Sequence, residues 1–189
     1  MSRVTDPNKV RLTGENSFIT LHKDGNGPVT LKASHWRILF SPVGPGHALF
    51  LKGDLTEDKA RVYTDNSGLA RWLQQEARQV GSDKDDPLIQ AAFTRSGDAL
   101  STWTEMVRSD RDSVVLSWYD LGEPFIFRSD PGSRPGIVHG VYSCLIPARM
   151  AEVSINDKLA SGKPLAQQID ERASSSACLA FSETWLKPY

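Results

Sequence analysis

Short runs of alternating apolar and polar residues dominate the chain, and turn-forming residues separate them. Alternate side chains of an extended strand share one face, so such runs predict half-buried β-strands. The runs cover residues 17–23, 29–33, 35–41, 47–52, 59–64, 88–95, 101–108, 113–120, 125–128, 137–146, 151–155 and 177–186. Asn156-Asp157 is a hairpin signal that joins 151–155 to the region from Lys158. The pattern predicts about ten to twelve strands joined by turns.

One segment departs from this pattern. Between Asn66 and Val80 the apolar residues recur at spacings of three and four, which is typical of one face of a helix. The apolar positions are Leu69, Trp72, Leu73, Ala77 and Val80. Asp65, Asn66 or Ser67 can cap the start of this helix, and Gly81 can end it. Its apolar stripe must pack on a sheet or across a barrel mouth.

These elements predict a mainly β fold, an antiparallel β-barrel or β-sandwich with one amphipathic helix. The general architecture resembles lipocalin-like barrels. The order of elements differs, because a helix follows the first five strands, and no Gly-x-Trp signature stands near the N-terminus. No residue role is therefore transferred from the lipocalins.

The length of 189 residues predicts a single β-rich domain from residue 16 to 189. Residues 1–15 are polar, and we expect a partly disordered N-terminal segment there. The stretch from Gln167 to Ser176 is also polar and has room for one helical turn. The run from Ile137 to Ile146 is apolar on both faces, which predicts a central strand covered on both sides.

The composition narrows the classes of function. The 22 basic and 23 acidic residues give a net charge of −1, and the basic residues are scattered. A nucleic-acid-binding protein or a protein on an anionic membrane needs a basic face, so we expect neither partner. No apolar run reaches the ~20 residues of a membrane-spanning helix. The N-terminus has no apolar core of a secretion signal, so we expect a soluble, cytoplasmic protein.

Cys144 and Cys178 lie in two separate apolar runs. A disulfide between them is sterically allowed if their strands are neighbours. Two buried thiols fit a cytoplasmic protein better.

Two carboxylates stand among aromatic residues and are the first candidates for catalysis. Glu105 shares a predicted strand face with Trp103, and Glu183 lies between Phe181 and Trp185. Burial in such surroundings raises the pKa of a carboxyl group, which makes a general acid or base near neutral pH. The alternative is that both faces point to solvent, where a carboxylate beside a tryptophan is ordinary.

His139 is the third catalytic candidate, because it lies on a predicted strand face between Ile137 and Val141. It can act as a general base or a hydrogen-bonding group, although a histidine on an apolar face is also a common core residue. The histidines are dispersed without a metal-binding spacing, and neither a nucleophile elbow nor a phosphate-binding loop is present. We therefore expect no metal and no cofactor.

Aromatic residues suggest the lining of a ligand site. The candidates are Trp103, Trp118, Tyr142 and Trp185. The first hypothesis is a small, mainly apolar or aromatic metabolite bound in a barrel or sandwich cavity, partly closed by the helix. Cofactor-free isomerisation, cyclisation, hydration or elimination would fit such a site. The alternatives are a non-catalytic interaction module or homo-oligomer subunit with a Trp/Tyr-rich face, or a carbohydrate-binding module.

Overall fold

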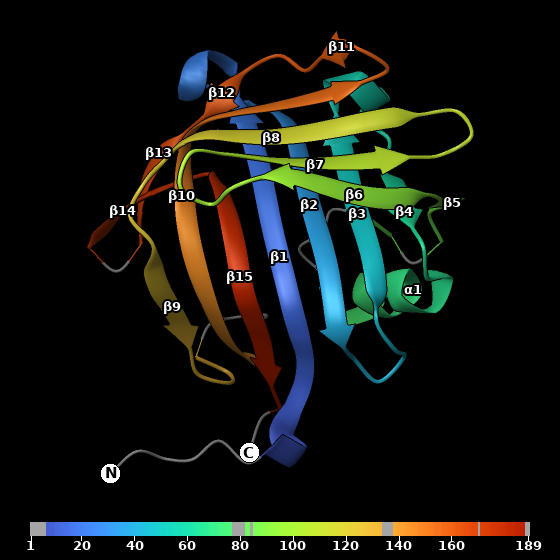
Figure 1. The fold of residues 1–189 in the computed structure, drawn as a ribbon, viewed down its shortest axis with the longest axis vertical. Helices are drawn as coiled ribbons and strands as arrows, with labels where there is room; N and C mark the ends of the chain where they lie inside the picture. The colour runs from blue at the N-terminus through green and yellow to red at the C-terminus, as the bar shows by residue number, and fades with distance from the viewer. Residues whose placement is uncertain (1–6, 77–81, 84, 134–137, 170, 188–189) are drawn as a thin grey trace.

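Strands make up most of the chain (Figure 1). The computed structural model describes residues 7–76, 82, 83, 85–133, 138–169 and 171–187. The strands within these residues are β1 (Val10–His22), β2 (Val29–Phe40), β3 (Gly46–Gly53), β4 (Arg61–Thr64), β5 (Leu88–Gln90), β6 (Ala92–Gly97), β7 (Thr102–Arg108), β8 (Ser113–Leu121), β9 (Phe125–Ser129), β10 (Gly140–Ile155), β11 (Lys158–Leu159), β12 (Lys163–Pro164), β13 (Ala166–Ile169), β14 (Arg172–Ser175) and β15 (Ala177–Leu186). The prediction of a mainly β fold is confirmed.

Ten strands form one continuous path of hydrogen-bonded neighbours, in the order β5-β4-β3-β2-β1-β15-β10-β8-β7-β6. The two ends of this path, β5 and β6, are separated in sequence by Ala91 alone. The chain therefore leaves its pairing with β4 and begins its pairing with β7 within one residue, so the sheet curls into a nearly closed barrel. The sheet is mixed, because β4 and β5 pair in parallel, whereas the sequence predicted antiparallel pairing throughout.

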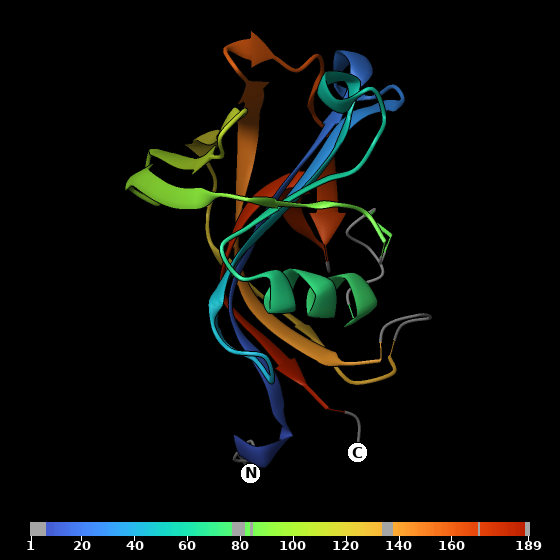
Figure 2. The same cartoon turned by 90° about the vertical axis from the view of Figure 1, so that its right-hand side faces the viewer.

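The long strands bury both of their faces, each against a different layer. In β3, Leu49 and Leu51 belong to one apolar core, while Ala48 and Phe50 belong to another. In Figures 1 and 2, strands β6, β7 and β8 cross one face of the sheet, and the helix α1 (Ser67–Glu76) lies on the opposite face. The alternation of side chains along one strand thus supplies two separate cores.

Helix α1 packs as its apolar spacing predicted. Leu69, Trp72 and Leu73 are buried in the second core, together with Trp36 of β2 and Trp185 of β15. The Asn66 side-chain oxygen accepts a hydrogen bond from the backbone N–H of Leu69, at 3.1 Å, which caps the first turn. The predicted helix ran on to Val80, and residues 77–81 lie outside the described residues.

Several elements differ from the sequence prediction. The runs 29–33 and 35–41 form one strand, β2, and the run 88–95 is divided between β5 and β6. Strand β1 begins at Val10, so residues 10–15 are part of the sheet rather than of a disordered segment. The two strands predicted between residues 137 and 155 form one strand, β10, and Ile137 lies outside the described residues. The expected helical turn within 167–176 is wrong, because β13 and β14 form a hairpin there. The polar composition had hidden the strands, because β13 is largely exposed and the buried residues of β14 are the serines Ser174 and Ser175.

The strand β10 is central, as predicted, because it pairs with β15 on one side and with β8 and β9 on the other. Cys144 of β10 and Cys178 of the neighbouring β15 are free thiols. Burial raises the pKa of the Cys178 thiol to about 11, so it is protonated and unreactive at neutral pH.

A β-bulge in β15 changes the side on which its last residues lie. Tyr142 pairs with Thr184, but Cys144 pairs with Phe181, so β15 has one extra residue between these positions. Ser182 has a left-handed φ of 56° at this point. Phe181 consequently packs against the first core, whereas Trp185 lies in the second. The predicted common face of Phe181, Glu183 and Trp185 is therefore wrong, because alternation is interrupted at the bulge.

Ser182 is exposed, and the bulge predicts that glycine is tolerated better than valine at this position. Ser182→Val should lower the free energy of unfolding by about 1–2 kcal/mol, because a β-branched side chain is strained at positive φ. Ser182→Gly should change it by less than about 0.5 kcal/mol, since glycine adopts this conformation freely. Urea unfolding measures both, with Ser96→Val, at an exposed position of β6 without a positive φ, as the control. A Val variant as stable as the Gly variant would show that the bulge is absent.

Candidate functional site

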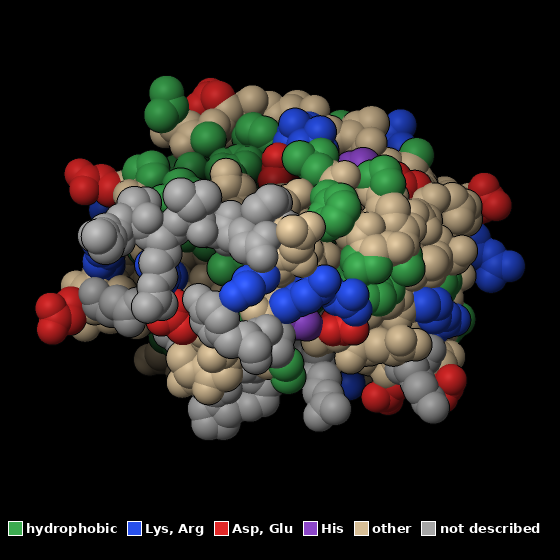
Figure 3. Space-filling model, turned by 90° about the horizontal axis from the view of Figure 1, so that it is seen from below, with side chains coloured by type: hydrophobic (Ala, Val, Ile, Leu, Met, Phe, Trp, Pro, Cys, Tyr) green, Lys and Arg blue, Asp and Glu red, His purple; other side chains and the backbone are tan. Residues whose placement is uncertain are grey.

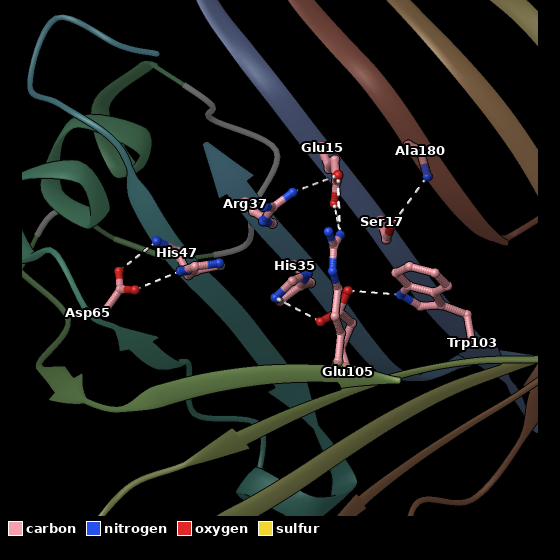
Figure 4. Close-up of polar contacts among 10 residues, drawn as sticks. Glu15, Ser17, His35, Arg37, His47, Asp65, Trp103, Glu105 and Ala180 are labelled. Carbon is pink, nitrogen blue, oxygen red and sulfur yellow. Dashed lines mark hydrogen bonds and ion pairs between the residues drawn. The ribbon is translucent and has the colours of Figure 1, made fainter. Parts of the chain in front are cut away.

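The inward face of β2 brings a histidine to one of the predicted carboxylates. His35 of β2 and Glu105 of β7 face each other, with 3.9 Å between His35 Nε2 and Glu105 Oε2. Both side chains are buried, with 2% and 5% of their surfaces exposed. The Trp103 indole N–H donates a hydrogen bond of 2.8 Å to Glu105 Oε1 (Figure 4). His35 Nε2 has no hydrogen-bond partner in the described part of the chain.

Burial sets the protonation of this pair. It raises the pKa of Glu105 to about 7, although the Trp103 hydrogen bond and the nearby Arg95 act in the opposite direction. It lowers the pKa of His35 to about 3, and the neighbouring His47, Arg95 and Arg37 lower it further. Near neutral pH the imidazole is therefore uncharged, and the carboxyl group is close to half protonated. The protonated carboxyl is the state that can donate toward His35 Nε2.

A charged network surrounds the open end of this interior. The Glu15 carboxylate of β1 receives hydrogen bonds from Arg37 at 3.0 Å and from Arg95 at 3.1 Å. The Arg95 guanidinium also lies over the Trp103 ring, 5.4 Å from its centroid. Charge-assisted bonds of this kind hold long side chains in defined positions. The network places two cations at the margin of the His35–Glu105 pair.

His47 and Asp65 form a second acid/base pair at the same end of the barrel. His47 Nδ1 lies 2.6 Å from Asp65 Oδ2, and Asp65 Oδ1 accepts the His47 backbone N–H, also at 2.6 Å. The His47 ring stacks on Phe93, with centroids 5.0 Å apart, and extends from Asp65 toward His35 (Figure 4). Its centroid lies 6.4 Å from that of His35. The hydrogen bond to Asp65 fixes the ring and directs Nε2 away from the carboxylate.

An open pocket of about 650 Å³ adjoins this second pair. It lies between the β2–β3 turn and the N-terminal end of α1, and its walls include Arg37, Leu39, His47, Asp65, Asn66 and Gln90. A volume of this size is in the range of small-molecule sites. Its wall therefore offers a cation, a carboxylate-oriented imidazole and amide side chains to a bound molecule.

Three other predicted residues, Glu183, Trp185 and His139, gather on the opposite face of the sheet. The Trp185 indole N–H donates to Glu183 Oε1 at 2.8 Å, and His139 stacks on the Trp185 ring at 5.5 Å. His35 and Trp36 are consecutive in β2, so they point to opposite faces; His35 meets Glu105, while Trp36 packs edge-on against Trp185 at 5.4 Å. The sheet thus separates Glu183, Trp185 and His139 from Glu105 and Trp103.

Two carboxyl groups near Trp185, those of Glu183 and Glu76, have shifted pKa values. Burial raises the pKa of Glu183 to about 7, against hydrogen bonds from Trp185 and Ser143 that lower it. His139 Nε2 lies 2.9 Å from Glu76, which is also paired with Arg11 at 3.0 Å. Burial acts to raise the pKa of Glu76, but these two partners outweigh it, so the pKa is lowered.

The remaining predicted lining residues lie apart from the pocket. Trp118 is fully buried in the first core and donates to the Phe18 carbonyl at 3.1 Å. Tyr142 is 41% exposed on β10. Trp103 is half-buried, and its ring packs edge-on against Phe181 at 5.6 Å. Of these three, Trp103 is the residue that contacts Glu105 and Arg95.

Sequence reasoning did not select His35, Arg37, His47 or Asp65. A signal for three of them existed, since the turn at residues 42–46 predicts that 35–41 and 47–52 pair as a hairpin. In the structure Arg37 pairs directly with His47, and His35 pairs with Leu49, so these side chains share a face. Asp65 follows β4 and had no such signal.

Comparisons of the chain with protein-family models, with curated proteins and with solved structures find no match. The described helix is too short to cross a membrane. Among the described residues, no three His, Cys, Asp or Glu side chains are grouped as metal ligands. The site must therefore be judged on its own geometry.

The raised pKa of Glu105 predicts a pH-dependent effect of Glu105→Gln. The folded state holds this proton more tightly than the unfolded state, whose carboxyl titrates near the ordinary value of 4.5. Its contribution to stability is complete below about pH 4.5 and is lost as the pH rises through 7. Glutamine has no charge to bury, so the variant should gain about 2–3 kcal/mol relative to the native protein between pH 5 and pH 8.

Chemical denaturation at the two pH values measures this difference. Glu123→Gln, at an exposed carboxyl, serves as the matched control. It should change the free energy of unfolding by the same amount at pH 5 and at pH 8. An equally constant effect for Glu105→Gln would mean that Glu105 is ionised in the folded protein throughout this range.

Proposed function

We propose that this protein binds a small molecule at the open end of the barrel and transfers a proton to and from it without a cofactor. The observation that carries the proposal is the His47–Asp65 pair, 2.6 Å apart, in the wall of a 650 Å³ pocket. A carboxylate that holds one imidazole nitrogen orients the ring and stabilises the imidazolium formed when the other nitrogen accepts a proton.

In this proposal His47 Nε2 is the general base and Asp65 is its positioning residue. The bond between carbon and hydrogen breaks, its electron pair stays on the substrate, and the proton moves to Nε2. Arg37, in the same wall, stabilises negative charge that develops on a substrate oxygen. The reverse transfer, to the same or a neighbouring carbon, completes an exchange or an isomerisation.

Glu105 has a supporting role in this proposal. It lies deeper in the same end of the barrel, separated from His47 by His35. A carboxyl group whose pKa is about 7 gains and loses a proton easily near neutral pH. We assign it the task of holding a proton beside the neutral His35, which keeps this end of the interior free of permanent charge.

This proposal retains the acid/base chemistry expected from the sequence but assigns it to a different site, around His47 and Asp65. Of the three predicted catalytic residues, Glu105 remains near the proposed site, whereas Glu183 and His139 lie on the other face of the sheet. The apolar or aromatic character of the ligand, the lipocalin-like architecture and the cytoplasmic location stay predictions.

An interaction module that uses a tryptophan-rich face has less support. Trp36, Trp72, Trp118 and Trp185 are all buried, so they do not offer an aromatic surface to a partner. On the face seen in Figure 3, hydrophobic side chains occur in separate patches among intermixed acidic and basic groups. Neither observation points to a docking platform or to a carbohydrate-binding face.

Deuterium exchange tests the proposed proton transfer. Small ketones, dicarbonyl compounds and oxo acids are incubated with the protein in D₂O, and loss of their C–H signals is followed by NMR. At least one compound should exchange faster with the native protein. Asp65→Asn should slow this exchange by about 10²-fold or more, and His47→Gln should remove the acceleration, because orientation and general-base catalysis each contribute at this scale.

His22→Gln is the matched control, since His22 bonds to the Gly27 carbonyl at a distant turn. This variant should exchange substrates as fast as the native protein. If every compound exchanges equally fast with the native protein and with His47→Gln, the proposed reaction is wrong.

A further inference from the structure

Two arginines share a single carboxylate beside the pocket. Arg37 and Arg95 both bond to Glu15, at 3.0 Å and 3.1 Å. Two positive charges against one negative charge leave one positive charge uncompensated within this group. A cation in excess at the margin of a concave site attracts small anions.

The arrangement also leaves Arg37 able to bind. Arg37 lines the pocket, and 31% of its side-chain surface is exposed, whereas Glu15 is 16% exposed. The guanidinium has five N–H donors in a planar fork, and its bond to Glu15 is made through Nη1. A guanidinium held from one side is pre-organised for a planar carboxylate on another side.

The other titratable groups at this end determine how strongly an anion is attracted at a given pH. Asp65 is engaged by His47, through Nδ1 and through the backbone N–H, both at 2.6 Å. His35 is neutral, because its pKa is lowered to about 3. Glu105 is neutral when protonated and negative above its pKa of about 7. The local charge therefore becomes more favourable to an anion as the pH falls from 8 to 6.

We propose that the pocket takes small carboxylates, with Arg37 binding the carboxylate group while Glu15 and Arg95 hold Arg37 in place. Arg37 is the direct cross-strand partner of His47, and such paired residues have Cβ atoms roughly 5 Å apart. A carboxylate bound by Arg37 therefore lies on the sheet face that also carries the imidazole. This inference rests on the proposed function and names the substrate class for its pocket.

Binding of benzoate and benzamide tests the inference, because the two probes have similar shapes and differ in charge. Both are titrated into ¹⁵N-labelled protein and followed by NMR at pH 6. Benzoate should bind about tenfold more tightly than benzamide, a preference of the size that one charge-assisted contact supplies. At pH 8 the preference should be smaller.

Variants show whether Arg37 is the cause. Arg37→Gln should bring the two affinities to within about twofold of each other, and Arg37→Lys, which retains the charge and the partner Glu15, should keep part of the preference. Arg149→Gln is the control, because Arg149 is an exposed arginine paired with Asp120, and it should leave the preference unchanged. Equal affinities in the native protein, or a preference that survives Arg37→Gln, would overturn the inference.

This outcome is independent of the proposed proton transfer. If neutral ketones exchange deuterium through His47 while benzoate and benzamide bind equally, the reaction stands and the carboxylate class is wrong. If benzoate is preferred through Arg37 but no compound exchanges, the pocket binds carboxylates and the reaction is wrong.

Discussion

Burial of both faces of the same long strands is the constraint on which the rest of the structure depends. In β2, His35 faces the interior beside Glu105, and the next residue, Trp36, faces the helix layer beside Trp185. A slip of one residue in the pairing of β2 would exchange these two sets of neighbours. It would bring an indole to the carboxyl group and an imidazole into the apolar core. The pairing that positions α1 is thus the same pairing that assembles the candidate site.

Desolvation gives that site its character. The first core is built of apolar side chains, and Figure 4 shows polar side chains gathered on the neighbouring parts of β1, β2 and β7. His35 and Glu105 are buried, so both favour their uncharged forms. Glu15, Arg37 and Arg95 are more exposed, with 16%, 31% and 37% of their side-chain surfaces accessible. Titratable groups whose pKa values are strongly shifted, next to a pocket, mark a candidate functional site.

The sequence predicted what depends on regular local geometry. The three- and four-residue spacing of Leu69, Trp72 and Leu73 identified α1, and simple alternation placed Glu105 with Trp103 because β7 is an uninterrupted strand. Alternation failed for Glu183, since one extra residue at Ser182 moved it to the opposite face. Such a bulge depends on the pairing of β15 with both of its neighbours. That pairing cannot be predicted from the sequence of β15 alone.

The residues of the pocket were harder to predict, for a related reason. His47 and Asp65 are 18 positions apart and meet because β4 pairs with β3 and the chain then turns into α1. Glu15 joins Arg37 through the pairing of β1 with β2 and reaches Arg95 across the barrel. Contacts of this kind arise from the closure of the sheet, so they follow from the topology and not from any single segment.

The protonation of the buried pair tests the account most directly. NMR of protein labelled with ¹³C in its carboxyl groups and ¹⁵N in its imidazoles gives the titration of each side chain between pH 4 and pH 9. The account predicts that the Glu105 carboxyl titrates near pH 7 and that His35 stays neutral down to pH 4. A Glu105 that titrates near its ordinary value of 4.5, with a His35 that titrates near 6.5, would contradict it.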